Sequence, residues 1–165
     1  MKTRLSLLFV LFYFQPLALA AEDDCTFNSE SATSDFLKNP NVAYSTWNAK
    51  TKEGSAILSD GGLLYVKKWA CHHVGMDARL IVMYSREALD KRAYWINKAL
   101  WLGKQVLEKS DFEIFNTTMA KKEFRLETSE RKIIFHIPHK TYSEFRVSIS
   151  EENYMTVLNI YYYFG

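Results

Sequence analysis

The side chains with the widest chemical range in this sequence are its histidines and cysteines. Cys71 precedes His72 and His73, and His136 and His139 form a second pair. A cysteine nucleophile needs a histidine base beside it, but adjacent residues on an extended chain point to opposite faces. Two histidine pairs that converged in space could bind zinc or copper, although their spacing gives little support for such a site. We therefore expect neither cysteine catalysis nor a metal site.

Short motifs that identify an enzyme are absent from the chain. There is no phosphate-binding loop, no dinucleotide-binding glycine motif, no G-x-S-x-G, no H-E-x-x-H and no C-x-x-C. The carboxylates also give no clear acid–base pair, because spacing along strands does not reveal whether two of them face each other across a cleft. We expect a protein without catalytic activity and without a cofactor.

The beginning of the chain has the pattern of a secretory signal peptide. A positive start at Lys2 and Arg4 precedes an apolar run and a small-residue cleavage site before Ala21. The apolar run is shorter than the roughly 20 residues that span a bilayer, so we expect cleavage and no membrane attachment afterwards. The sequence predicts a signal peptide over 1–20 and a single periplasmic domain over 21–165.

Charge and composition indicate which partners the mature chain can bind. Removal of the signal peptide would leave 19 basic and 19 acidic residues. A chain without net charge, and with no basic block larger than a residue pair, lacks the surface that binds nucleic acid or an anionic membrane. The content of 48% hydrophobic and 15% aromatic residues is that of a globular protein. We expect a protein partner.

Export would place both cysteines of the chain, Cys25 and Cys71, in an oxidising compartment. We expect one disulfide between them, which would close a loop of about 47 residues and stabilise the fold by roughly 4 kcal/mol on chain-entropy grounds. The alternative is a pair of buried free thiols.

The first half of the mature chain is typical of antiparallel strands. A brief helix is expected within Ser29–Lys38. Apolar runs then flank Ser59-Asp60-Gly61-Gly62, which predicts a hairpin whose second strand continues to Cys71. We predict another strand at Arg79–Tyr84, so Cys71–Asp77 would be the connection between the two strands.

A long helix is expected over residues 86–109, with Ser85 as its cap. Apolar residues recur there in two rows at steps of three and four, so the helix would lie across a sheet. Trp95 and Trp101 are expected to pack in the core rather than to bind a ligand.

Beyond Lys109 the apolar and polar residues alternate with the period of a strand. We predict strands near Glu113–Lys121, 124–128, 133–137, 145–149 and Tyr154–Phe164. On the last of these, Tyr161 and Tyr163 would face one side while Tyr162 and Phe164 face the other. The order of strands, helix and further strands predicts an α+β fold, in which an antiparallel β-sheet packs against one long helix in a single domain.

One segment resembles a known family. It reads Cys71-His72-His73-Val74-Gly75-Met76, followed by Arg79-Leu80-Ile81-Val82-Met83-Tyr84-Ser85. This segment resembles the exposed histidine-containing loop and following strand of the periplasmic c-type lysozyme inhibitors of bacteria. Those inhibitors are small exported α+β proteins whose loop plugs the lysozyme cleft. The resemblance covers residues 71–85 only, and the family brackets its loop with two nearby cysteines, whereas this chain has Cys71 alone there.

The resemblance implies an inhibitory loop, and the residues suggest a compatible site. A short loop held by a disulfide loses little conformational entropy on binding, so it suits an enzyme cleft. We expect the partner-binding residues to be Trp69, His72, His73, Met76 and Asp77. The protein would inhibit a cell-wall-degrading enzyme by steric occlusion, either as a lysozyme inhibitor or as an immunity protein against a toxin.

Other interpretations of the sequence stay open. The loop could be a connection without function. The helix and the sheet could enclose a pocket for a small apolar ligand, with Trp95, Trp101 and the C-terminal tyrosines as its walls. A small hydrolase would require carboxylates or histidines with shifted pKa values converging in a cleft.

Overall fold

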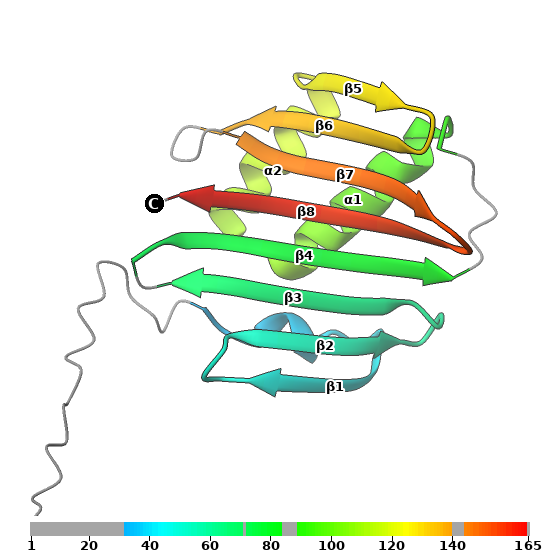
Figure 1. The fold of residues 1–165 in the computed structure, drawn as a ribbon. Helices are drawn as coiled ribbons and strands as arrows, with labels where there is room; N and C mark the ends of the chain where they lie inside the picture. The colour runs from blue at the N-terminus through cyan, green and yellow to red at the C-terminus, as the bar shows by residue number, and fades with distance from the viewer. Residues whose placement is uncertain (1–31, 71, 84–88, 140–143, 165) are drawn as a thin grey trace, which may run out of the picture.

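The computed structural model describes residues 32–70, 72–83, 89–139 and 144–164, which form one large antiparallel sheet with helices on one face (Figure 1). Its strands are β1 (Val42–Asn48), β2 (Glu53–Leu58), β3 (Leu63–Ala70), β4 (Val74–Met83), β5 (Arg125–Ser129), β6 (Lys132–Pro138), β7 (Glu144–Glu152) and β8 (Met155–Phe164). Their order across the sheet is β1-β2-β3-β4-β8-β7-β6-β5. Two four-stranded meanders are therefore joined in the middle, where β4 pairs with β8.

In the sequence, two helices rather than one lie between the two meanders. They are α1 (Arg92–Val106) and α2 (Lys109–Lys121), and a 3-10 turn, η2 (Asp35–Lys38), precedes β1. The prediction of one long helix over 86–109 packed on the sheet is therefore wrong, and the predicted fold class is wrong with it. The helix ends at Val106 because Leu107 is extended, and its backbone N–H bonds to the carbonyl of Gly103.

The prediction of a strand at Glu113–Lys121 is also wrong, because α2 occupies this segment. Its buried residues, Phe115, Thr118 and Met119, have the spacing of a helix face rather than of a strand. The helix ends where Lys122 adopts the left-handed conformation, with φ of 58°, and its N–H bonds to the carbonyl of Met119. This is the usual backbone solution for a helix C-terminus.

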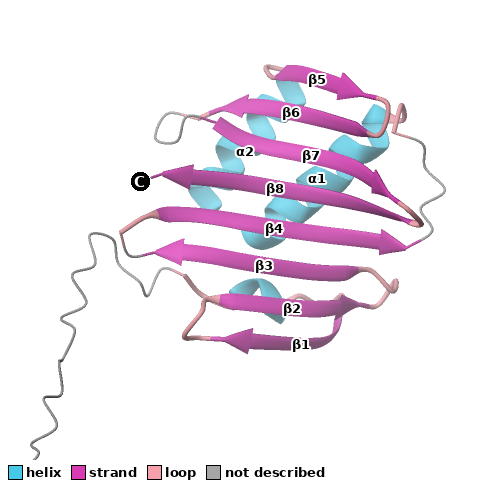
Figure 2. Ribbon diagram, viewed as in Figure 1, coloured by secondary structure: helices cyan, strands magenta, loops and turns pink. Residues whose placement is uncertain are grey.

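Both helices lie on the same face of the sheet (Figure 2). Inward-facing strand residues and the buried sides of α1 and α2 form the core, in which Phe115 of α2 packs edge-to-face on Phe145 of β7 at 5.9 Å. Trp95 is 1% exposed, so its expected place in the core is confirmed.

Several local predictions are confirmed. The hairpin turn lies at Ser59–Gly62, where Gly61 has φ of 84° and Asp60 Oδ1 accepts a hydrogen bond from the Gly62 N–H. The strands predicted around 124–128, 133–137, 145–149 and Tyr154–Phe164 correspond to β5, β6, β7 and β8. The brief helix expected within Ser29–Lys38 corresponds to η2.

Other local predictions fail or concern residues outside the described ranges. The connection expected over Cys71–Asp77 is shorter than predicted, since β4 begins at Val74. Strand β1 was not predicted from the sequence. The signal peptide over 1–20, and the cysteines Cys25 and Cys71, lie outside the described residues.

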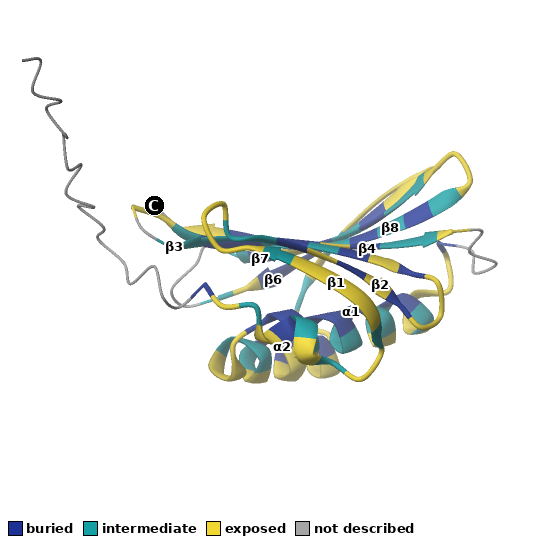
Figure 3. Ribbon diagram, turned by 90° about the horizontal axis from the view of Figure 1, so that it is seen from below, coloured by how far each residue is buried: buried dark blue, intermediate teal, exposed yellow. Residues whose placement is uncertain are grey.

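The opposite face of the sheet is not covered by any of the described helices or strands (Figure 3). We call it the open face. Neither described helix is long and apolar enough to cross a membrane.

Candidate functional site

Alternation along the strands determines which side chains reach the open face. On β3, Val66 is fully buried on the helix side, so Lys67 and Trp69 lie on the open face. Lys67 is opposite Asp77 of β4, and Asp77 is opposite Tyr161 of β8. Charged and aromatic side chains from three neighbouring strands therefore stand in one row.

Four rings meet at the end of β3, β4 and β8 and form what we call the aromatic cluster. The ring of Trp69 contacts those of Tyr161 and Tyr163 edge-to-face, with 6.4 Å between centroids in each pair. His73 lies beside Tyr163, with 5.1 Å between the ring centroids. The Nζ of Lys67 is 5.7 Å from the centre of the Trp69 ring, within the range of a cation–π contact. These contacts hold the rings in fixed orientations.

The aromatic cluster depends on a glycine. Gly75 lies in register with Trp69 on one side and with Tyr163 on the other. A Cβ at this position would be 2.7 Å from the carbonyl oxygen of Tyr162 and 3.3 Å from the ring of Tyr163. The missing side chain therefore lets the two rings meet across β4.

A polar network continues from the aromatic cluster along the open face. Lys67 Nζ lies 2.8 Å from a carboxylate oxygen of Glu53, and this hydrogen bond lowers the pKa of Glu53. Arg79 Nε donates to Asp77 Oδ1 at 3.1 Å, and Asp77 raises the pKa of Arg79. Asn159 also donates to Asp77. The network fixes long side chains that would otherwise lose entropy on binding.

A second polar group lies on β5, β6 and β7. The ring of His136, which is 8% exposed, lies between Glu144 at 2.8 Å and Glu127 at 3.3 Å. Burial disfavours ionisation of Glu144, but His136 and Arg146 outweigh this effect, so the pKa of Glu144 is below its usual value. No group of three or more potential ligands suited to a metal ion occurs among the described residues.

The end of the open face near β1 is apolar. Tyr44, Ile57 and Leu63 are exposed there by 63%, 46% and 42%, and together with Ile81 they line a groove of about 370 Å³. Contiguous exposed apolar groups of this kind mark interaction sites in many proteins.

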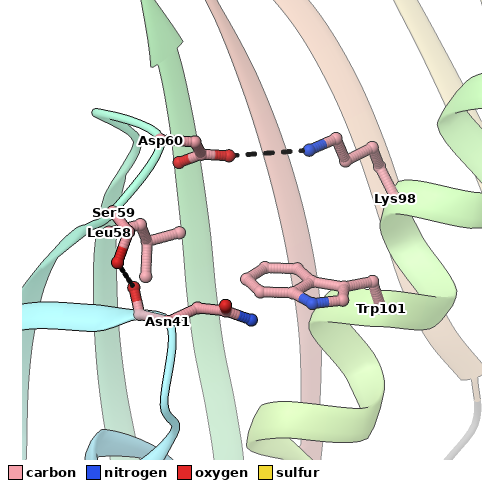
Figure 4. Close-up of a pocket in the computed structure, with 6 residues that line it drawn as sticks. All are labelled: Asn41, Leu58, Ser59, Asp60, Lys98 and Trp101. Atoms are coloured by element: carbon pink, nitrogen blue, oxygen red, sulfur yellow. Dashed lines mark hydrogen bonds and ion pairs between the residues drawn. The ribbon is translucent and has the colours of Figure 1, made fainter.

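The helix side of the sheet carries a cleft between the β2–β3 turn and α1 (Figure 4). Trp101 of α1 forms one wall and Leu58 of β2 lies across from it. Asp60 and Lys98 lie 3.9 Å apart at the cleft, and the Asn41 side chain points toward Trp101. The cleft therefore combines an indole face with groups that donate and accept hydrogen bonds.

One buried acid–base pair lies apart from both surfaces. His139 Nε2 is 3.6 Å from Asp111 Oδ1, and their side chains are 3% and 14% exposed. Desolvation raises the pKa of Asp111, and the nearby His139 opposes this effect. Neither residue lines the cleft at Trp101. A hydrolase would need such a pair to face its substrate cleft, and Asp111 and His139 do not face the cleft at Trp101.

The residues predicted to bind a partner lie on two sides of the sheet. Trp69, His73 and Asp77 are brought together on the open face. His72 is exposed in the short β3–β4 connection. Met76 is fully buried and faces the helices, so it has no surface to offer a partner.

Sequence reasoning did not connect Tyr161 and Tyr163 to this group. The alternation with Tyr162 indicated that Tyr161 and Tyr163 share one face of their strand. It did not indicate that this strand, β8, pairs with β4. Glu53 and Asn159 carried no signal of their own, because their roles depend on cross-strand contacts.

Comparison of the chain with protein families, with curated proteins and with solved structures finds no match. The site is therefore interpreted from its own geometry.

Proposed function

We propose that this protein acts by binding, and that it holds a partner protein against the open face of its sheet, with the aromatic cluster at the centre of the contact. The aromatic cluster carries the proposal. Trp69 and Tyr163 are large amphipathic rings, and Tyr163 remains 40% exposed. Such residues dominate the energetics of protein interfaces.

The surroundings of the cluster suit an interface as well. Lys67, Asp77 and Arg79 provide charges of both signs beside the rings, as in the polar rim of a typical interface. Contacts across strands to Glu53 and Asn159, and the contact along β4 between Arg79 and Asp77, hold these side chains before any partner arrives, which reduces the entropy lost on association. The apolar groove at Tyr44 and Ile57 extends the same face.

For the partner, we propose a cell-wall-degrading enzyme, blocked by steric occlusion. The expected export of the chain and the resemblance of residues 71–85 to lysozyme inhibitors support this class. The partner would be either a lysozyme or a toxin against which the protein confers immunity. The contact region differs from the loop predicted from sequence, since β4 begins at Val74 and the rings of β3 and β8 supply most of the surface.

Binding and inhibition assays against a panel of peptidoglycan hydrolases test the proposal. The chain without residues 1–20 should capture and inhibit at least one of them. Trp69→Ala and Tyr163→Ala should each weaken binding by 2 kcal/mol or more, about 30-fold, as expected of central interface residues. Tyr154→Ala removes a ring that is 77% exposed in the β7–β8 turn, and it should leave binding unchanged.

Two results would overturn this proposal. One is a panel in which no hydrolase is bound. The other is a bound hydrolase whose affinity is the same for the parent protein, Trp69→Ala and Tyr163→Ala. Thermal unfolding of each variant verifies that a lost interaction does not reflect a lost fold.

A further inference from the structure

The cleft at Trp101 has no part in the proposed function, since it lies on the helix side of the sheet. It has two lobes, of about 390 Å³ and 190 Å³. Both lobes are lined by Leu58, Asp60, Lys98 and Trp101. The larger lobe is within the range of roughly 300–1,000 Å³ that is usual for small-molecule sites.

Trp101 and Leu58 supply the apolar part of the larger lobe. Trp101 is half-buried beside the core and borders the cleft, with the Nζ of Lys98 5.9 Å from the centre of its ring, and Leu58 lies across from it (Figure 4). A flat aromatic surface packs well against a ring that carries C–H groups on its face. Because Leu58 is only 4% exposed, a ligand with a planar or gently puckered ring would bury apolar area mainly against Trp101.

The polar groups of the cleft both donate and accept hydrogen bonds. Asp60 accepts, Lys98 donates, the Asn41 amide does both, and the Ser59 hydroxyl, which already donates to the Asn41 carbonyl, can still accept. Asp60 and Lys98 are 3.9 Å apart, which is longer than a hydrogen bond, so each retains capacity for a ligand. Their opposite charges also cancel within the cleft.

The walls of the cleft are held in place by local contacts. The Ser59 hydroxyl donates to the backbone carbonyl of Asn41 at 3.1 Å, and the Ser59 N–H donates to the same carbonyl at 2.8 Å. The Gly62 N–H donates to Asp60 Oδ1 at 3.0 Å. A ligand would meet groups that are already positioned.

We propose that this cleft binds a neutral pyranose sugar, stacked on Trp101 and hydrogen-bonded by Asp60, Lys98 and Asn41. An entirely apolar ligand would desolvate a carboxylate and an ammonium without replacing their hydrogen bonds. An anion would face Asp60, and a cation would face Lys98. A sugar ring has both an apolar face and a rim of hydroxyls, so it matches the whole lining.

Titration of the protein with four sugars tests this site. The probes are N-acetylglucosamine, its β-1,4-linked dimer, glucose and maltose, and binding is followed by calorimetry and by the NMR signals of the indole N–H groups. At least one probe should bind saturably, with a Kd of about 1 mM for a contact of this size. The perturbed indole signal should be that of Trp101.

Four variants give the matched comparison. Trp101→Ala and Lys98→Ala should each weaken sugar binding about tenfold, equal to 1.4 kcal/mol. Lys104→Ala changes an exposed lysine on the same helix and should have no effect. Trp101→Phe keeps an aromatic wall, and it should retain part of the affinity if Trp101→Ala fails to fold.

The proposal is overturned if none of the four sugars binds at about ten times that concentration. It is also overturned if Trp101→Ala binds as well as the parent protein. Both outcomes are independent of the hydrolase assays, because those depend on Trp69 and Tyr163 on the opposite face of the sheet.

Discussion

Trp69 of β3 and Tyr163 of β8 contact each other across the strand that separates them. Their ring centroids are 6.4 Å apart and the rings are nearly perpendicular. The residue between them in the register is Gly75 of β4. Two side chains that belong to strands without mutual hydrogen bonds thus form one surface, because the intervening strand has no side chain there.

Gly75→Ala should destabilise the protein by about 1–3 kcal/mol, because the new methyl group would collide with the carbonyl oxygen of Tyr162 at 2.7 Å. Urea unfolding measures the change. Gly61→Ala is the comparison, since Gly61 has a positive φ but no atom within 4 Å of an added Cβ. It should cost about 1 kcal/mol from backbone conformation alone. Equal or greater stability of Gly75→Ala would contradict the packing described for the aromatic cluster.

Trp69→Ala and Tyr163→Ala should be coupled in stability. Edge-to-face pairs contribute about 0.5–1.5 kcal/mol beyond the area that they bury. The double variant should therefore lose less stability than the sum of the two single variants, by a difference in that range. A double-mutant cycle from urea unfolding gives this value, and strict additivity would show that the two rings do not interact.

Gly103→Ala should reverse the usual effect of this substitution in a helix. Alanine ordinarily stabilises a helix interior by up to about 1 kcal/mol relative to glycine. In α1, however, an added Cβ would lie 2.9 Å from the ring of Phe115, which is fully buried. We expect a net loss of about 1–2 kcal/mol in the free energy of unfolding.

The same change in a Phe115→Leu background is its control. Leucine removes the ring that crowds the new methyl group, so Gly103→Ala should become neutral or stabilising there. The same sign in both backgrounds would contradict close packing of α1 on α2.

Glu144→Gln should reduce stability at neutral pH by up to about 1 kcal/mol, because partly exposed ion pairs are weak. The folded-state pKa of Glu144 is lowered, so its contribution is present above the pKa of the unfolded chain. The contribution is lost as the pH falls through the folded-state pKa. The difference between parent and variant should thus shrink in acid, as followed by thermal unfolding between pH 7 and 3. Glu130→Gln in the exposed β5–β6 turn should show no such trend.

Local patterns were sufficient for the hairpins and for most strands. The turn at Ser59–Gly62 needs a positive φ at Gly61, and the glycine that favours this conformation is visible in the sequence. The alternation in the last strand correctly placed Tyr162 and Tyr163 on opposite faces of the sheet.

The helical periodicity did not predict where α1 ends. Leu107 continues the apolar row of α1 and is 9% exposed, so its residue type fits a longer helix. Its extended backbone ends the helix instead. The seven residues of β1 gave little signal, because most of this edge strand is exposed and its residues are mostly polar or small.

The candidate site could be predicted only in part. Trp69, His73 and Asp77 are close in sequence, and the structure places them on the same side of the sheet. Tyr163 joins them only through the pairing of β4 with β8, a register that no local pattern specifies. The cleft at Trp101 likewise depends on where α1 lies relative to the β2–β3 turn.

The strand order also has a consequence for how the chain folds. β8 follows all the other described strands in sequence, yet it lies in the middle of the sheet, between β4 and β7. During synthesis, the two meanders have no backbone pairing with each other until β8 has emerged from the ribosome. The pairing of β4 with β8 joins residues as distant as Val74 and Phe164, and such long-range pairing is slow. If the chain is exported as its first residues predict, this delay would keep the sheet incomplete while the polypeptide is still being made.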